Sequence, residues 1–149
     1  MENELDSRVY DYCRELVRKC QDHRNWAKRM FGKYELPAMA AVCRFHGIIK
    51  NAYSYPMFGN KCNPILEQAI HPFGKINQRP TLPNLERAYP LGNCAEQHAA
   101  DKVLNQACSE DCKIYLRNLR YSIAMRPRTK QRFAACRNCQ AILPNVRLK

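Results

Sequence analysis

The sequence lacks acidic residues after Asp111. Residues 1–112 hold 15 basic and all 13 acidic side chains, whereas residues 113–149 hold 10 basic ones and none that is acidic. Most of the formal net charge of +12 therefore belongs to the last quarter of the chain. Nucleic acid is the expected partner, because phosphates bind Lys and Arg with release of counterions. A solvated basic face that keeps the protein soluble is the alternative.

Long apolar runs are also missing. No stretch approaches eighteen apolar residues, and charges recur throughout the first thirty positions, so we expect neither a membrane span nor a secretory signal and no membrane partner. There is no internal repeat and no low-complexity tract. A length of 149 residues suits one domain, residues 1–149, with one core.

A complete disulfide framework is excluded by the odd number of cysteines, nine. Reduced thiols in a cytosol-like compartment are expected. Cys13, Cys20 and Cys43 lie in apolar periodic runs, where a free cysteine packs as a small hydrophobic side chain. Cys108 and Cys112 are interpreted as an incidental pair at a helix end.

The N-terminal part, residues 1–50, is predicted to be helical. Apolar residues repeat every three or four positions over residues 3–30, and a second helix is predicted over 37–49. Residues 51–83 contain five prolines and two glycines, so regular structure there must be short and interrupted.

The C-terminal part, residues 85–149, contains clearer signals. A helix is predicted over 94–106, with Asn93 as its cap, and a strand over 113–124. Residues 126–132 form a basic loop, and a short helix is predicted from Cys136 to a point before Pro144. Residues 145–149 are the expected last strand.

Two short motifs in this part carry metal-binding chemistry. Cys94-Ala95-Glu96 is followed some forty residues later by Cys136-Arg137-Asn138-Cys139. Three thiolates from Cys94, Cys136 and Cys139 suit a Zn²⁺ ion and leave one position for water, whose pKa the metal lowers. Helix N-termini beside the cysteines would lower the thiol pKa values. Glu96 then takes the role of the group that moves protons.

The motifs resemble those of a known family. The run Tyr89-Pro90-Leu91-Gly92-Asn93-Cys94-Ala95-Glu96 and the run Ala135-Cys136-Arg137-Asn138-Cys139-Gln140 resemble the two zinc-binding segments of cytidine deaminases. The resemblance covers residues 85–143. It implies an α/β fold with three α-β-α layers, a small mixed sheet of fewer than five strands and a helical N-terminal extension. It also implies catalytic zinc and loss of ammonia from cytosine.

The substrate is expected to be a base on single-stranded DNA or RNA. The Asn-x-Glu pattern with which free-cytidine enzymes hold ribose is not found, and Ala135 replaces the usual proline. The expected nucleic-acid contacts are four cations of the basic loop and two aromatic residues as stacking candidates: Arg126, Arg128, Lys130, Arg132, Phe133 and Tyr89. Stacking and core packing are equal alternatives for the two aromatic rings.

Compact domains of this kind resemble the deaminase modules of bacterial polymorphic toxins. That resemblance implies a cytoplasmic site of action after delivery as part of a secreted toxin, and a cognate inhibitor or immunity protein as a partner.

Two other functions stay open. His98 follows Cys94 by one helical turn, so Cys94, His98, Cys136 and Cys139 could form a closed Cys₃His site in a non-catalytic nucleic-acid-binding module. The other alternative is a deaminase of free cytidine or a nucleotide, which the Tyr89-Pro90-Leu91-Gly92 stretch favours.

Overall fold

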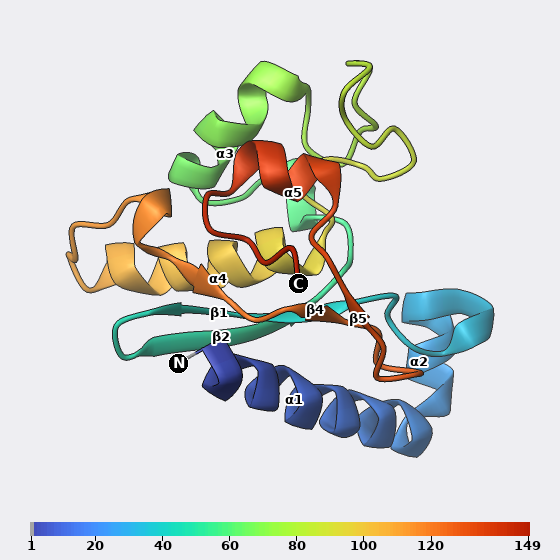
Figure 1. Ribbon diagram of the computed structural model, residues 1–149. Coiled ribbons are helices and arrows are strands. Elements are labelled where there is room, and N and C mark those ends of the chain that lie inside the picture. The colour runs from blue at the N-terminus through green and yellow to red at the C-terminus, as the bar shows by residue number, and fades with distance from the viewer. Residues whose placement is uncertain (1) are drawn as a thin grey trace.

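The computed structural model describes residues 2–149 and combines helices with a small antiparallel sheet. Helix α1 lies on one face of the sheet, and α3, α4 and α5 lie on the other (Figure 1). The α-helices are α1 (Glu2–Asp22), α2 (Arg24–Phe31), α3 (Pro64–Ile70), α4 (Ala95–Ser109) and α5 (Arg137–Ile142). The strands are β1 (Ala40–Phe45), β2 (Ile48–Tyr53), β3 (Arg120–Tyr121), β4 (Ala124–Met125) and β5 (Arg132–Phe133). Short 3₁₀ turns are η1 (Gly32–Tyr34), η2 (Phe58–Asn60), η3 (His71–Phe73) and η4 (Leu116–Asn118).

The sheet is antiparallel at every pairing, in the order β2-β1-β4-β5, with β3 also paired to β1. The expectation of a mixed sheet is therefore wrong. After β2 the chain passes through α4 and returns as β3 and β4. These strands pair with β1 rather than with β2, and they run antiparallel to β1. The sheet also has five strands rather than fewer, because two short strands pair with β1 at different positions along it: β3 with Cys43 and Arg44, and β4 with Ala40.

Residues 37–49 do not form the predicted helix. Residues 40–53 form a β-hairpin, with a turn at His46 and Gly47 where His46 adopts a φ of 51°. Strand β1 is buried on both faces: Ala40 and Val42 pack against α1, whereas Cys43 and Phe45 belong to the core under α4. A strand buried on both faces has a continuous apolar run, which periodicity alone does not distinguish from a helix. Residues 40–50 of the expected helical N-terminal part are therefore strand and turn.

The predicted N-terminal helix is present, with a break at His23 between α1 and α2. Its apolar stripe packs on the sheet through Leu5, Val9 and Cys13. Buried Asp6 accepts a hydrogen bond from the Ile123 backbone N–H at 2.8 Å and pairs with the Arg147 guanidinium at 3.1 Å. These contacts attach α1 both to the strand region and to the C-terminal segment.

The predicted strand over 113–124 is reduced to β3 and β4, with η4 before them. Ser122 interrupts the strand: its backbone N–H donates to the Val42 carbonyl and its hydroxyl accepts from the Val42 N–H, both at 2.9 Å. The expected strand over 145–149 is not formed. The Ala135 N–H donates to the Arg147 carbonyl at 2.8 Å, and the Asn145 side chain donates to the carbonyls of Arg117 and Leu119, but the segment has no strand assignment.

Several predictions are confirmed. Regular structure over residues 51–83 is short and interrupted, consisting of the end of β2, η2, α3 and η3. Helices α4 and α5 occupy the predicted helical segments, with α5 ending before Pro144. All nine cysteines are unpaired, and Cys13, Cys20 and Cys43 are buried. Among residues 2–149, no helix has both the length and the apolar character needed to cross a membrane.

Candidate metal centre

The three predicted cysteine ligands come together where two helices begin. Cys94 is the N-cap residue of α4, Cys136 is that of α5, and Cys139 lies in the first turn of α5. Their sulfur atoms all lie within 4.8 Å of one another, with Cys94 and Cys136 at 3.3 Å. Sulfurs bound to tetrahedral zinc are about 3.8 Å apart, as bond lengths near 2.3 Å require. The three thiols therefore fit a metal ion in both chemistry and spacing.

The protonation of the cluster also suits a cation. Hydrogen bonds from the thiols of Cys139 and then Cys94 lower the pKa of Cys136 to about 3. The same hydrogen bonds hold the pKa values of Cys94 and Cys139 well above the usual range, because both thiols donate to the Cys136 thiolate. The Cys136 thiolate thus accepts hydrogen bonds from the thiols of Cys94 and Cys139. A cation that binds all three sulfurs takes the place of these two thiol protons.

Gln97 supports the cluster from behind and was not anticipated from the sequence. Its fully buried side chain donates from Nε2 to the Cys139 sulfur at 3.4 Å, and its Oε1 accepts from the Gly92 N–H at 2.8 Å. A hydrogen bond to a ligand sulfur orients that ligand and tunes its charge. The only available signal in the sequence was its position directly after Glu96.

Glu96 is held in an unusual environment for a carboxylate. It lies in the first turn of α4 and is 5% exposed. Burial is the main cause that raises its pKa to about 7; a hydrogen bond with its own backbone N–H opposes this increase, and the nearby Cys136 adds to it. A carboxyl group with a pKa near neutrality both accepts and donates protons, as a general acid and base must.

A cavity of about 440 Å³ opens beside these groups. Cys94, Glu96 and Cys136 all line it. So do three of the predicted nucleic-acid contacts: Tyr89, Arg126 and Phe133. The Arg126 guanidinium lies over the Phe133 ring, 4.7 Å from its centroid, so the two form one wall of the cavity.

The other three cations of the basic loop do not line this cavity. Arg128 lies over the ring of Tyr34, and Lys130 donates from Nζ to the Pro127 carbonyl within the turn. Arg132 lines a separate hollow with Asp6 and Asp11. The loop thus presents its charges in several directions rather than as one ring around the site.

Asn138 connects the metal-binding helix to the loop that carries Tyr89. The fully buried side chain accepts from the Glu86 N–H at 2.8 Å and donates to the carbonyls of Glu86 and Tyr89 at 3.1 and 3.0 Å. One amide thus satisfies three backbone groups of the loop. Sequence reasoning treated Asn138 only as a spacer between two cysteines.

Asn93 does not cap α4, contrary to prediction. Cys94 occupies the cap position without a side-chain hydrogen bond, because the thiol points to the cysteine cluster instead. The Asn93 side chain lines the cavity, and its Oδ1 is buried without a partner in the described part of the chain. An unpaired amide beside Glu96 leaves hydrogen-bonding capacity for a ligand.

His98 is not part of the sulfur cluster. Its Nε2 hydrogen-bonds to the Tyr55 carbonyl, and burial lowers its pKa, so a neutral ring that donates to this carbonyl is favoured. We expect His98→Gln to retain one zinc per chain, because the three sulfurs are untouched and glutamine still offers an N–H to Tyr55. Metal analysis of the purified variant checks this. Loss of zinc from a folded variant would instead support the closed Cys₃His site.

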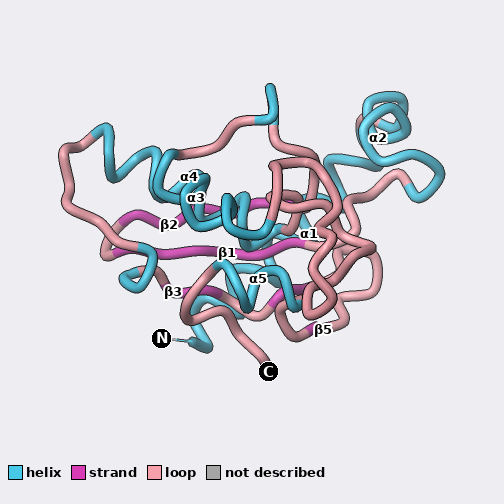
Figure 2. Tube along the Cα trace, turned by 90° about the horizontal axis from the view of Figure 1, so that it is seen from above, coloured by secondary structure: helices cyan, strands magenta, loops and turns pink. Residues whose placement is uncertain are grey.

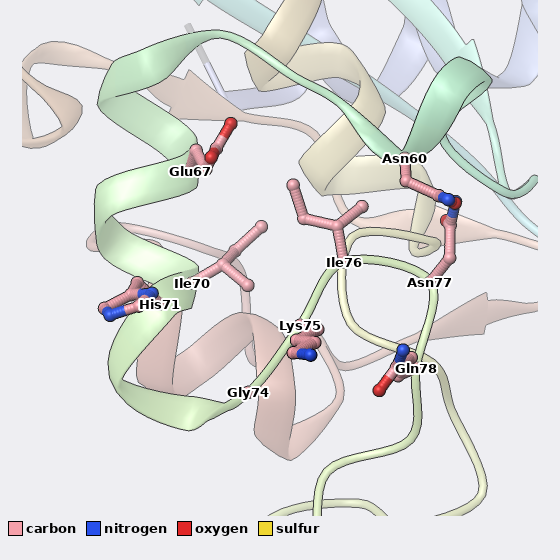
Figure 3. A pocket seen from close by; sticks show the side chains of 9 residues that line it. All are labelled: Asn60, Glu67, Ile70, His71, Gly74, Lys75, Ile76, Asn77 and Gln78. Carbon is pink, nitrogen blue, oxygen red and sulfur yellow. The ribbon is translucent and has the colours of Figure 1, made fainter.

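A second hollow, of about 510 Å³, lies between α3 and residues 74–78 (Figure 3). Its lining includes Glu67 on α3 and His71, the first residue of η3, but their side chains point in different directions. The Asn60 and Asn77 side chains hydrogen-bond to each other across it at 2.6 Å. These groups do not converge on a common point, so the chemistry of the chain is concentrated in the cavity beside the cysteines.

Comparison of the chain with protein-family models, with curated proteins and with solved structures found no match. The site is therefore defined by its own geometry. A group of three sulfurs that could hold a metal ion borders a cavity that also contains a buried carboxyl group with a pKa near 7.

Proposed function

We propose that this protein is a zinc-dependent hydrolytic deaminase that converts cytosine to uracil in single-stranded nucleic acid. The observation that carries the proposal is that Glu96 lines the same cavity as Cys94 and Cys136, two members of the three-sulfur group. Cys94, Cys136 and Cys139 would hold the zinc, which when bound supplies a Lewis acid that activates water. The overall reaction consumes one water and releases one ammonia for each cytosine.

The residues of the cavity divide the remaining work. Glu96 takes a proton from the attacking water and passes protons to the ring nitrogen and to the departing amine. The faces of Phe133 and Tyr89 suit stacking with an unstacked base, and Arg126 suits the adjacent phosphate. Tyr89 is 50% exposed, so its ring is available for such contact.

Free cytidine is the second candidate substrate. Glu86 also lines the cavity, and its carboxylate would accept hydrogen bonds from sugar hydroxyls but repel a phosphate. The basic charge of the last 37 residues favours the polynucleotide. Action in the cytoplasm, delivery as part of a toxin and a cognate inhibitor protein rest on the family resemblance alone and stay predictions.

The test is a panel of substrates. We expect zinc-loaded protein to convert cytosine in single-stranded DNA or RNA, with little conversion in double-stranded DNA, because the base must leave its stack before it reaches the buried site. Mass spectrometry of the products measures the conversion. Turnover of cytidine alone would move the assignment to the second candidate, and absence of turnover on every substrate would contradict the proposal.

A further inference from the structure

The metal-site cavity adjoins another hollow. This neighbouring hollow has a volume of about 380 Å³ and shares Ala38 and Arg126 with the cavity. Its remaining lining comes from the segment after α2 and from the basic loop: Phe31, Tyr34, Leu36, Pro37 and Arg128. The two hollows are therefore neighbours, with Arg126 on the border between them.

The neighbouring hollow presents an exposed aromatic ring. Tyr34 is 57% exposed, and two cations lie over its ring: Arg128 Cζ and Lys33 Nζ, each 5.1 Å from the centroid. Phe31 forms the packed floor, with edge-on contacts to the rings of Trp26, Tyr53 and Tyr55. The ring of Tyr34 is thus open to a ligand, whereas that of Phe31 is held in place.

The charge of this region is unbalanced. Residues 24–34 hold four basic side chains and no acidic one. Glu35 lies close by, but it pairs with Arg24 and Lys28 on α2. Among the side chains that the structure describes, those of residues 4–149, no carboxylate pairs with Lys33, Arg126 or Arg128. Cations that border an exposed ring without a counter-charge match the combination of phosphate and base in a nucleotide.

Tertiary structure brings these groups together from opposite ends of the chain. The α2–η1 segment and the β4–β5 turn lie at the same end of the molecule in both views (Figures 1 and 2). The contact between Tyr34 and Arg128 joins them directly. The N-terminal helices, which the family resemblance does not cover, thereby contribute to the surroundings of the metal site.

We propose that the hollow around Tyr34 is a subsite for the nucleotide next to the target base of a single-stranded nucleic acid. The neighbouring base stacks on Tyr34, and the phosphate between the two nucleotides lies between Arg126 and Arg128. This inference rests on the proposed function, because it assumes that the target base occupies the cavity beside Glu96. It assigns to Arg128 a role outside the catalytic cavity.

Binding of labelled oligonucleotides to Tyr34→Ala tests the subsite. The probes are short single-stranded DNA and RNA with one central cytosine, and fluorescence anisotropy with zinc-loaded protein gives Kd. We expect Kd to rise by about 5- to 100-fold, the range found when a stacked base loses its aromatic partner. We expect Arg128→Gln to reduce the slope of log Kd against log salt by about 0.7, as for one lost phosphate contact on a single strand.

Tyr115→Ala is the matched control. Tyr115 is also exposed, at 41%, and also has two cations over its ring, Lys113 at 5.9 Å and Arg117 at 4.3 Å. It lies in the segment after α4, just before η4, and lines none of the hollows described above. Its loss should leave Kd unchanged, so an equal weakening by both tyrosine variants would indicate diffuse electrostatic binding and overturn the subsite.

The outcomes separate this inference from the proposed function. Cytosine conversion together with unchanged binding by both Tyr34→Ala and Arg128→Gln would leave the deaminase standing and remove the subsite. Tyr34-dependent binding without conversion of any cytosine would contradict the deaminase but keep a nucleotide-binding hollow. If Tyr34→Ala does not fold, the salt dependence measured with Arg128→Gln decides, because Arg128 is exposed and its truncation leaves the core intact.

Discussion

Glu96→Gln is expected to lower the rate of cytosine conversion by about 10²- to 10⁴-fold, the contribution of a positioned general acid and base. Glutamine has nearly the same shape as glutamate and fits the same buried position, so packing and the cysteine cluster should persist. The glutamine amide does not exchange protons near neutral pH, however. The variant therefore lacks the carboxyl group whose pKa burial raises to about 7. The initial rate at saturating oligonucleotide, together with zinc content, measures the effect.

Glu86→Gln is the control for this variant, because it removes the other carboxylate of the same cavity. The Glu86 backbone, held by Asn138, is unchanged by the substitution. We expect Glu86→Gln to keep more than a tenth of the activity, as a residue without a proton-transfer role should. Full activity of Glu96→Gln, with zinc bound, would show that the proposed mechanism is wrong.

Cys139→Ser is expected to remove the zinc and with it all conversion of cytosine. Cys139 is fully buried at the base of the cluster, and a serine hydroxyl is a poor replacement for a thiolate ligand. Metal that binds only the folded state stabilises it by about 2.7 kcal/mol when its free concentration is a hundred times Kd. The variant should therefore unfold about 5–10 °C below zinc-loaded wild type. Thermal unfolding with and without a chelator measures this difference.

Cys112→Ser is the matched control for loss of a thiol. Cys112 is exposed and lies outside the sulfur cluster. This variant should keep one zinc per chain and the thermal unfolding midpoint of the wild type. A chelator should lower that midpoint as much as it does in the wild type. If Cys139→Ser keeps stoichiometric zinc and shows the same shift, the three sulfurs are not the metal site.

The sequence by itself determined which residues form the candidate site. Cys94, Glu96, Cys136 and Cys139 were identified from two short motifs, and α4 and α5 were predicted close to their observed limits. Such signals are local: residue types at fixed spacing indicate ligands, and a helix start places neighbouring side chains within one turn of each other. No local signal shows that the two motifs meet in space. This was expected only because both were assigned to one metal site.

Only the tertiary structure decided which other residues border the site. The hairpin of β1 and β2 was mistaken for a helix because both faces of β1 are buried, one by α1 and the other by α4. Of the four cations expected around the site, Arg126 alone lines the cavity, whereas Tyr34, from the N-terminal part of the chain, lines the adjoining hollow.

Gln97 and Asn138 support the metal centre through hydrogen bonds that were likewise not predicted from the sequence. Their roles consist of hydrogen bonds to Cys139, Gly92 and the 86–89 loop, most of them to partners 42–52 positions away in the sequence. A local pattern predicts what a segment can form, but burial and hydrogen bonding depend on which distant segments pack against it. The cysteines were therefore predictable from the sequence, and their surroundings were decided by the packing of α4 and α5 on the sheet.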